Sequence, residues 1–170
     1  MCALFDVPGE RVIRDLWARL EERGVPTLAT HTHGRHHPHL SYVVLREWQL
    51  EHVRTALDAL PGGDPFPVNV QGTVVFPRGR AALAVAVPAD IARRQQHVTT
   101  AVEATGAELH RHYLPGSWIP HVSIATGAAG SLLPVAVTAI SDILPVTLTV
   151  TSAALVDSST GQTWRLQRIP

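Results

Sequence analysis

Two short stretches of the sequence repeat the pattern proline, histidine, hydrophobic residue, serine. They are Pro38-His39-Leu40-Ser41 and Pro120-His121-Val122-Ser123, and their histidines lie 82 positions apart. Imidazole titrates near neutral pH, so a neutral and a protonated histidine can divide the two proton transfers of a hydrolysis between them. A hydroxyl beside each imidazole can hydrogen-bond phosphate oxygens, where charge must be stabilised. The pattern therefore predicts metal-independent acid-base chemistry at a phosphate, if the fold brings the two stretches together.

Each motif lies in a stretch with the composition of a β-strand. Because side chains alternate along a strand, His39 and Ser41 are expected on one face, and so are His121 and Ser123. A proline ahead of each histidine is tolerated as the first residue of a strand. The apolar neighbours are expected to point the other way, into packing; they are Leu40, Tyr42, Val122 and Ile124.

The hydrophobic periodicity predicts the same order of elements twice, namely strand, helix, His-bearing strand, helix, strand. In the first copy these elements span residues 2–7, 10–23, 39–48, 49–60 and 68–76. In the second copy they span residues 81–87, 89 to about 112, 120–126, 131–143 and 146–156, and a last strand at 163–169 is extra. The motif is the third element of both copies, which indicates an internal duplication.

This order predicts a single α+β domain over residues 1–170, with two lobes built from repeats of about 1–78 and 79–170. We expect two antiparallel sheets that face a central groove, with helices on their outer faces. If a pseudo-two-fold axis relates the repeats, equivalent strands face each other, and both histidine motifs line the shared groove.

The paired His-Leu-Ser and His-Val-Ser motifs, each in a hydrophobic strand, resemble the 2H phosphoesterase superfamily and, within it, the 2′-5′ RNA ligase or RNA 2′,3′-cyclic phosphodiesterase-like group. The resemblance covers nearly the whole chain in architecture and about ten residues in sequence. It implies that His39 and His121 are the catalytic pair, and that Ser41 and Ser123 bind the substrate phosphate. It implies no cofactor and no metal.

The resemblance further implies a cyclic phosphodiesterase, with a nucleotide or RNA end carrying a 2′,3′-cyclic phosphate as substrate and 2′-5′ ligation as a related activity in some members. By analogy with the family, His39 would be the acid and His121 the base. Both hydroxyl positions are serine where threonine is frequent, which keeps the donor. RNA-acting members often have an arginine soon after the second motif, where this chain continues Ile124-Ala125-Thr126. Candidates to replace it are Arg35, Arg46, Arg78 and Arg80.

Composition and charge narrow the kinds of partner. The chain is 45% hydrophobic and 16% charged, which is typical of a globular protein. Fourteen basic residues, all of them arginine, balance fourteen acidic ones, so no overall positive field favours duplex nucleic acid. We expect a small phosphorylated ligand, no duplex DNA and a monomeric protein.

The sequence also predicts a cytoplasmic protein that does not associate with membranes. The longest apolar run, Ala81 to Val87, is far shorter than the ~20 residues of a spanning helix, and the N-terminal residues lack the pattern of a secretory signal. Cys2 is the single cysteine, which excludes an internal disulfide and a cysteine-based zinc cluster.

Two other functions stay open at this point. Five histidines within residues 31–39 suggest a zinc-dependent hydrolase, because zinc binds imidazole and His31 and His33 would share a strand face. The alternative for this run is a solvated loop, since it contains Gly34 and has no acidic residue nearby. The second function is a non-catalytic module that binds RNA ends or nucleotide phosphates. Tyr113 and Trp118 are expected to pack rather than to stack on a base.

Overall fold

The first half of the chain folds in the predicted order of strand, helix, strand, helix, strand. The computed structural model describes all residues from Met1 to Pro170. Asp6 begins the first helix as its N-cap, because its carboxylate accepts a hydrogen bond from the Gly9 amide at 2.8 Å. The elements of this half are β1 (Cys2–Phe5), α1 (Val7–Glu21), β2 (His39–Ser41), α2 (Leu50–Asp58) and β3 (Phe66–Phe76).

The second half repeats the order and adds a final strand, as the periodicity predicted. A single turn of 3-10 helix, η1, precedes the second His-bearing strand. The elements are β4 (Arg80–Ala86), α3 (Ala89–Glu103), η1 (Arg111–Tyr113), β5 (His121–Ala125), α4 (Leu132–Ser141), β6 (Val146–Val156) and β7 (Thr163–Arg165). No helix is long and apolar enough to span a membrane.

Two elements end seven or more residues earlier than predicted, and they pair with each other beyond their ends. The predicted strand at 39–48 stops at Ser41, and the helix predicted to reach residue 112 stops at Glu103. The backbone of residues 44–47 pairs with residues 108–110, with Arg46 and His110 amides donating to the Glu108 and Val44 carbonyls at 2.9 and 2.8 Å. These segments satisfy each other's backbone groups, so neither continues its own element.

The prediction of two antiparallel sheets was wrong, because the structure has one seven-stranded antiparallel sheet. Its strand order is β2-β1-β6-β3-β4-β5, with β7 beside β6. The two long central strands join the halves, since β3 pairs with β6 from Phe66 opposite Val150 to Val70 opposite Val146. Each of these strands has 11 residues and pairs with a second strand on its other edge, β3 with β4 and β6 with β1. The hydrogen-bonded sheet is therefore continuous.

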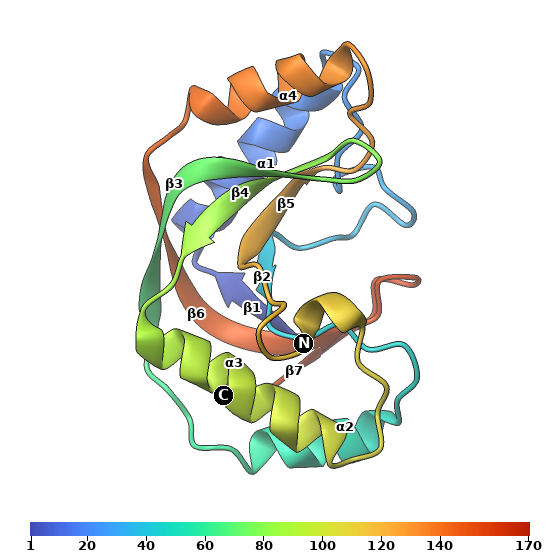
Figure 1. Cartoon of the computed structure of the whole chain (residues 1–170), viewed down its shortest axis with the longest axis vertical. Helices are drawn as coiled ribbons and strands as arrows, with labels where there is room; N and C mark the ends of the chain where they lie inside the picture. The colour runs from blue at the N-terminus through green and yellow to red at the C-terminus, as the bar shows by residue number, and fades with distance from the viewer.

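The strand order is symmetric about the junction of β3 and β6. The pairs β1 and β4, β2 and β5, and β3 and β6 hold equivalent places in the two halves. The His-bearing strands β2 and β5 are therefore the outermost strands of the main path. Nevertheless they contact each other, because the sheet curls, and they lie side by side in Figure 1.

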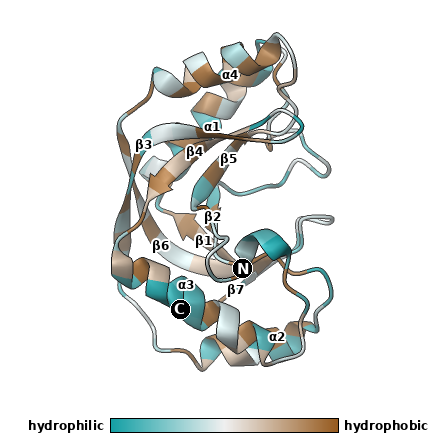
Figure 2. Cartoon of the chain, in the orientation of Figure 1, coloured by the Kyte–Doolittle hydropathy of each residue, from teal (hydrophilic) through white to brown (hydrophobic).

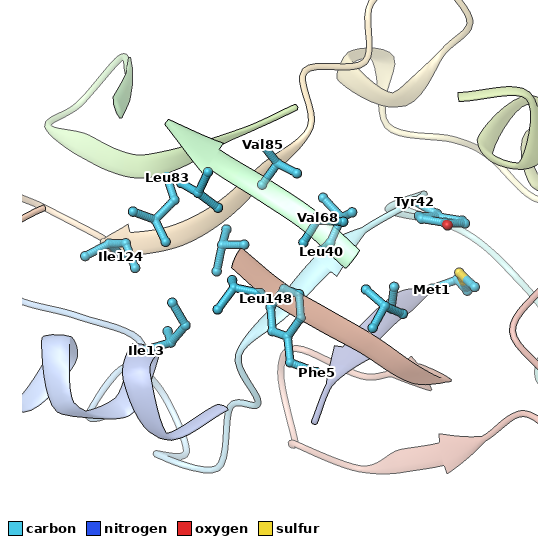
Figure 3. Close-up of a cluster of buried hydrophobic side chains, with 14 of the residues drawn as sticks. Met1, Phe5, Ile13, Leu40, Tyr42, Val68, Leu83, Val85, Ile124 and Leu148 are labelled. Carbon is cyan, nitrogen blue, oxygen red and sulfur yellow. The ribbon is translucent and has the colours of Figure 1, made fainter. Parts of the chain in front are cut away.

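The helices pack as two pairs, α1 with α4 and α2 with α3, at opposite ends of the molecule (Figure 1). Both α2 and α3 carry hydrophilic and hydrophobic residues, as Figure 2 shows, which is typical of helices with one buried face. The main hydrophobic cluster has 35 buried residues and includes Leu40 from β2 and Ile124 from β5 (Figure 3). The opposite face of β1 and β6 holds a small separate cluster of Cys2, Leu4 and Ala154.

A buried glutamine on α3 connects the two segments that flank the histidine strands. Gln95 is 2% exposed, and its amide nitrogen donates to the carbonyls of Tyr42 and Tyr113, both at 3.1 Å. Tyr42 follows Ser41 directly, and Tyr113 belongs to η1. This one side chain thus fixes the position of η1 relative to β2.

We predict that Gln95→Leu lowers the free energy of unfolding by about 1–3 kcal/mol, because it leaves buried carbonyls without a donor. Chemical denaturation monitored by circular dichroism would measure this change. The neighbouring Gln96 is exposed, so Gln96→Leu is the matched control and is expected to unfold like the wild type. Equal stability of the two variants would contradict the role given to Gln95.

Candidate active site

The two motif histidines are held in the same way. His39 Nδ1 lies 2.7 Å from the carbonyl oxygen of His37, and His121 Nδ1 lies 2.7 Å from that of Ile119. A carbonyl oxygen only accepts, so Nδ1 must carry the proton in both rings. The Nε2 atom of each imidazole is then the one that can exchange a proton with a substrate.

Alternation along the two strands agrees with the sequence prediction. Leu40, Tyr42, Val122 and Ile124 are all fully buried. His39, His121 and Ser123 are partly exposed, whereas Ser41 is 8% exposed. Each motif therefore presents an imidazole and a hydroxyl on the face away from the main core.

A tryptophan indole anchors the backbone of each motif serine. Trp17 Nε1 donates to the Ser123 carbonyl at 3.2 Å, and Trp118 Nε1 donates to the Ser41 carbonyl at 3.0 Å. Trp17 comes from α1, and Trp118 comes from the segment just before β5. The bond from Trp118 crosses between the two motifs, and the Trp118 ring also contacts the Tyr42 ring with centroids 6.0 Å apart. The structure thus brings the two predicted stretches together.

The first histidine lies beside the only cysteine. Cys2 is opposite Ser41, and Leu4 is opposite His39 in the pairing of β1 with β2, so all four side chains share one face. Burial raises the pKa of the Cys2 thiol, but His39, the Met1 α-amine and Ser41 together lower it to about 6. Burial and, to a smaller extent, the Met1 α-amine lower the pKa of His39, but Cys2 and the His37 carbonyl outweigh them and raise it above its usual value. His39 is thereby favoured in its protonated form.

The second histidine has the opposite environment. Its ring packs against Phe76, with centroids 4.7 Å apart. Burial and the nearby positive charge of His39 lower the pKa of His121, although the Ile119 carbonyl raises it in part. His121 is thereby favoured in its neutral form. Two histidines with the same backbone hydrogen bond thus have pKa values shifted in opposite directions by their surroundings.

Two residues of this region were missed by the sequence reasoning. The Tyr113 hydroxyl lies beside Ser41, and burial raises the Tyr113 pKa to about 12, so the phenol stays protonated as a donor. The sequence predicts a packing role for Tyr113, and it indicates for Cys2 only that there is no internal disulfide and no cysteine-based zinc cluster. The pairing of Cys2 with Ser41 depends on strand register, which the sequence does not show.

The histidine-rich run is a loop of turns rather than a strand. His33 Nδ1 accepts from the Arg35 amide at 2.9 Å, and His36 Nε2 lies 2.9 Å from the Thr32 hydroxyl. Burial and the neighbours His33 and His31 lower the pKa of His36 to about 4. No three histidine, cysteine, aspartate or glutamate side chains of the chain lie where they could hold one metal ion.

The candidate arginines have different positions. Arg35 donates to the Thr160 carbonyl at 2.6 Å, and Arg78 is in the turn between β3 and β4 with a positive φ of 66°. Burial is the largest cause that lowers the pKa of His110, and the adjacent His112 is the second. Three arginines lower it further, in decreasing order Arg46, Arg111 and Arg80. Arg46 follows β2 in the chain, and Arg80 is the first residue of β4, which pairs with β5.

We predict that Cys2→Ala lowers the pKa of His39, because it removes the negative charge that stabilises the imidazolium. Histidine side-chain ¹H–¹⁵N NMR spectra recorded over a pH series would measure both active-site histidines. Ser152→Ala alters a side chain opposite Leu4 on the same face without changing a charge, and serves as a control in which His39 titrates as in the wild type. An unchanged His39 pKa in Cys2→Ala would contradict the proposed interaction.

The chain was compared with known families and structures. The profile of the 2′-5′ RNA ligase superfamily matches residues 8–162. A crystal structure of a phosphoesterase is 14% identical, with coverage of 96% of this chain and 95% of that chain and a TM-score of 0.57. The structure of Kluyveromyces marxianus Usb1 is also 14% identical, with coverage of 98% and 94% and a TM-score of 0.53.

At this level of identity the two structures are evidence for the fold. No curated protein matches the chain. The family match spans both histidine motifs and five of the seven strands, β2 to β6. Together with the paired histidines on β2 and β5, it establishes that the chain belongs to the 2′-5′ RNA ligase superfamily, the 2H phosphoesterases.

Proposed function

We propose that the protein is a metal-independent phosphodiesterase that opens the 2′,3′-cyclic phosphate of a nucleotide or RNA end. The observation that carries this proposal is the opposite perturbation of two adjacent histidines. The pKa of His39 is raised and the pKa of His121 is lowered, although a backbone carbonyl holds Nδ1 of each ring in the same way. Family membership supports phosphoesterase chemistry.

In this mechanism His121 is the general base and His39 is the general acid. His121 Nε2 takes a proton from water as the water oxygen bonds to phosphorus. The bond from phosphorus to one ribose oxygen breaks, and His39 Nε2 donates its proton to that oxygen. The product is a nucleoside monophosphate ester, and the two histidines have exchanged protonation states.

The serine hydroxyls have the supporting role. We assign Ser41 and Ser123 to the non-bridging oxygens of the phosphate, since each shares the face of its histidine. Tyr113 lies close enough to Ser41 to orient its hydroxyl. Removing either serine hydroxyl is expected to cost about 1–3 kcal/mol of transition-state binding, the range for a hydrogen bond to a charged group.

We predict that His39→Ala and His121→Ala each lower kcat/KM on a nucleoside 2′,3′-cyclic phosphate by about 10²- to 10⁴-fold. A p-nitrophenyl phosphodiester separates their roles, because p-nitrophenolate leaves without being protonated. On that substrate His39→Ala is expected to regain most of the wild-type rate, whereas His121→Ala stays impaired. Steady-state kinetics with the two substrates measure this difference.

Several outcomes would contradict the mechanism. Rescue of His121→Ala instead of His39→Ala would reverse the acid and base. Activity abolished by EDTA, together with loss of activity in the triple variant of His31, His33 and His36, would replace the mechanism with metal catalysis. Absence of turnover of any cyclic phosphate would leave a binding module of the same fold.

We predict a broad bell-shaped dependence of kcat/KM on pH. The base must be neutral, so kcat/KM rises as the pH passes the lowered pKa of His121, below 6.5. The acid must be protonated, so kcat/KM falls as the pH passes the raised pKa of His39, above 6.5. Between these limbs most molecules hold both correct forms, which gives a plateau around neutral pH. A narrow maximum with both limbs on the same pKa would contradict the opposite shifts.

A further inference from the structure

A cavity of about 250 Å³ adjoins the candidate active site on one side only. His39 and Ser41 line it, together with Met1, Cys2 and the chain from Val43 to Arg46. The remaining walls are Trp48, His36, the last two residues of β6 and the following Asp157 and Ser158. Neither His121 nor Ser123 lines this cavity.

We propose that this cavity binds the nucleobase of the terminal nucleotide, with Trp48 as its stacking surface. The inference rests on the proposed function and adds to it the location of the base and the residues that contact it. The ligand class is an aromatic base attached to the ribose that carries the cyclic phosphate.

The direction of the reaction supports this location. In an in-line displacement at phosphorus, the attacking and leaving oxygens lie on opposite sides. The leaving oxygen must face the general acid, His39, and the water must face His121. In a 2′,3′-cyclic phosphate the leaving oxygen belongs to the ribose, so the ribose and its base extend to the side of His39, where the cavity opens.

The size and lining of the cavity suit one base. The volume of about 250 Å³ lies just below the range of about 300–1,000 Å³ that is usual for larger small-molecule ligands. Eight of the fourteen lining residues are hydrophobic, and they include Val44, Leu155 and Trp48. Arg46 and Ser158 add hydrogen-bond donors at the wall, which matches the mixed apolar and polar lining of small-ligand sites.

The walls are fixed in place before any ligand binds. The Trp48 ring packs edge-on against Trp164, with centroids 6.1 Å apart. The Val43 carbonyl accepts from the Met1 α-amine at 2.8 Å, and the Val44 carbonyl accepts from the His110 amide at 2.8 Å. A rigid aromatic wall loses little conformational entropy when a base stacks on it.

The experiment compares adenosine 2′,3′-cyclic phosphate with glycerol 1,2-cyclic phosphate, which has the same reacting ring but no base. We predict that wild-type kcat/KM is higher for the adenosine substrate by about tenfold to a hundredfold, the effect of stacking one base on an aromatic side chain. In Trp48→Ala this ratio is expected to fall close to one, and Trp48→Phe should keep most of it.

The matched aromatic control is Phe76→Ala, because Phe76 contacts His121 outside the cavity. This variant is expected to change both rates together and to keep the ratio. Ser158→Trp is a second test, since Ser158 is exposed in a turn and its enlargement fills the cavity without disturbing the core. It should lower the ratio even if Trp48→Ala fails to fold.

The outcomes separate this inference from the proposed function. If the wild type hydrolyses both substrates equally, or if the ratio survives in Trp48→Ala and Ser158→Trp, the cavity is not the base site and the phosphodiesterase proposal stands. If the wild type hydrolyses neither substrate, that proposal fails. In that case, calorimetry compares the binding of adenosine 2′-monophosphate with that of ribose 5-phosphate. If the nucleotide binds more tightly and Ser158→Trp abolishes this difference, the inference is supported. Equal binding of the two ligands overturns it.

Discussion

The pairing of β3 with β6 is the constraint on which the rest of the structure depends. These strands come from different halves of the chain, and their hydrogen bonds turn two similar halves into one continuous sheet. Because the sheet curls, its two outermost His-bearing strands come into contact. Each strand alone carries one imidazole and one hydroxyl, and only the contact between the strands brings the two motifs together.

The local design of the two motifs is nearly identical, yet their surroundings differ. A backbone carbonyl two residues earlier fixes the tautomer of each histidine, and an indole holds each serine carbonyl. Beyond these shared contacts, His39 faces a thiol with a depressed pKa, whereas His121 packs on the Phe76 ring. An anionic neighbour favours the charged imidazole and an apolar neighbour favours the neutral one. The duplicated fold thereby supplies two equivalent positions, and the different neighbours shift the pKa values of their histidines in opposite directions.

The asymmetry extends to the space around the pair. Residues 44–47, after β2, do not continue the sheet but pair with residues 108–110, after α3. This change of direction leaves room for the cavity beside His39. The Gln95 side chain connects the same region through hydrogen bonds to the Tyr42 and Tyr113 carbonyls. The pairing of residues 44–47 with residues 108–110 thus makes β2 shorter than predicted and also creates the cavity on one side of the site.

The sequence by itself determined the order of the elements, the duplication and the faces of the motif residues, because hydrophobic periodicity is local and records which side of a strand or helix is buried. Leu40 and Val122 were predicted to be buried for this reason, and they are. Only the tertiary structure decided that there is one sheet, that Cys2 lies opposite Ser41, and that Tyr113 reaches the Ser41 hydroxyl. Strand register and the pairing of distant segments depend on hydrogen bonds between backbones, which are alike at almost every residue, so their partners are chosen by the packing of the whole chain.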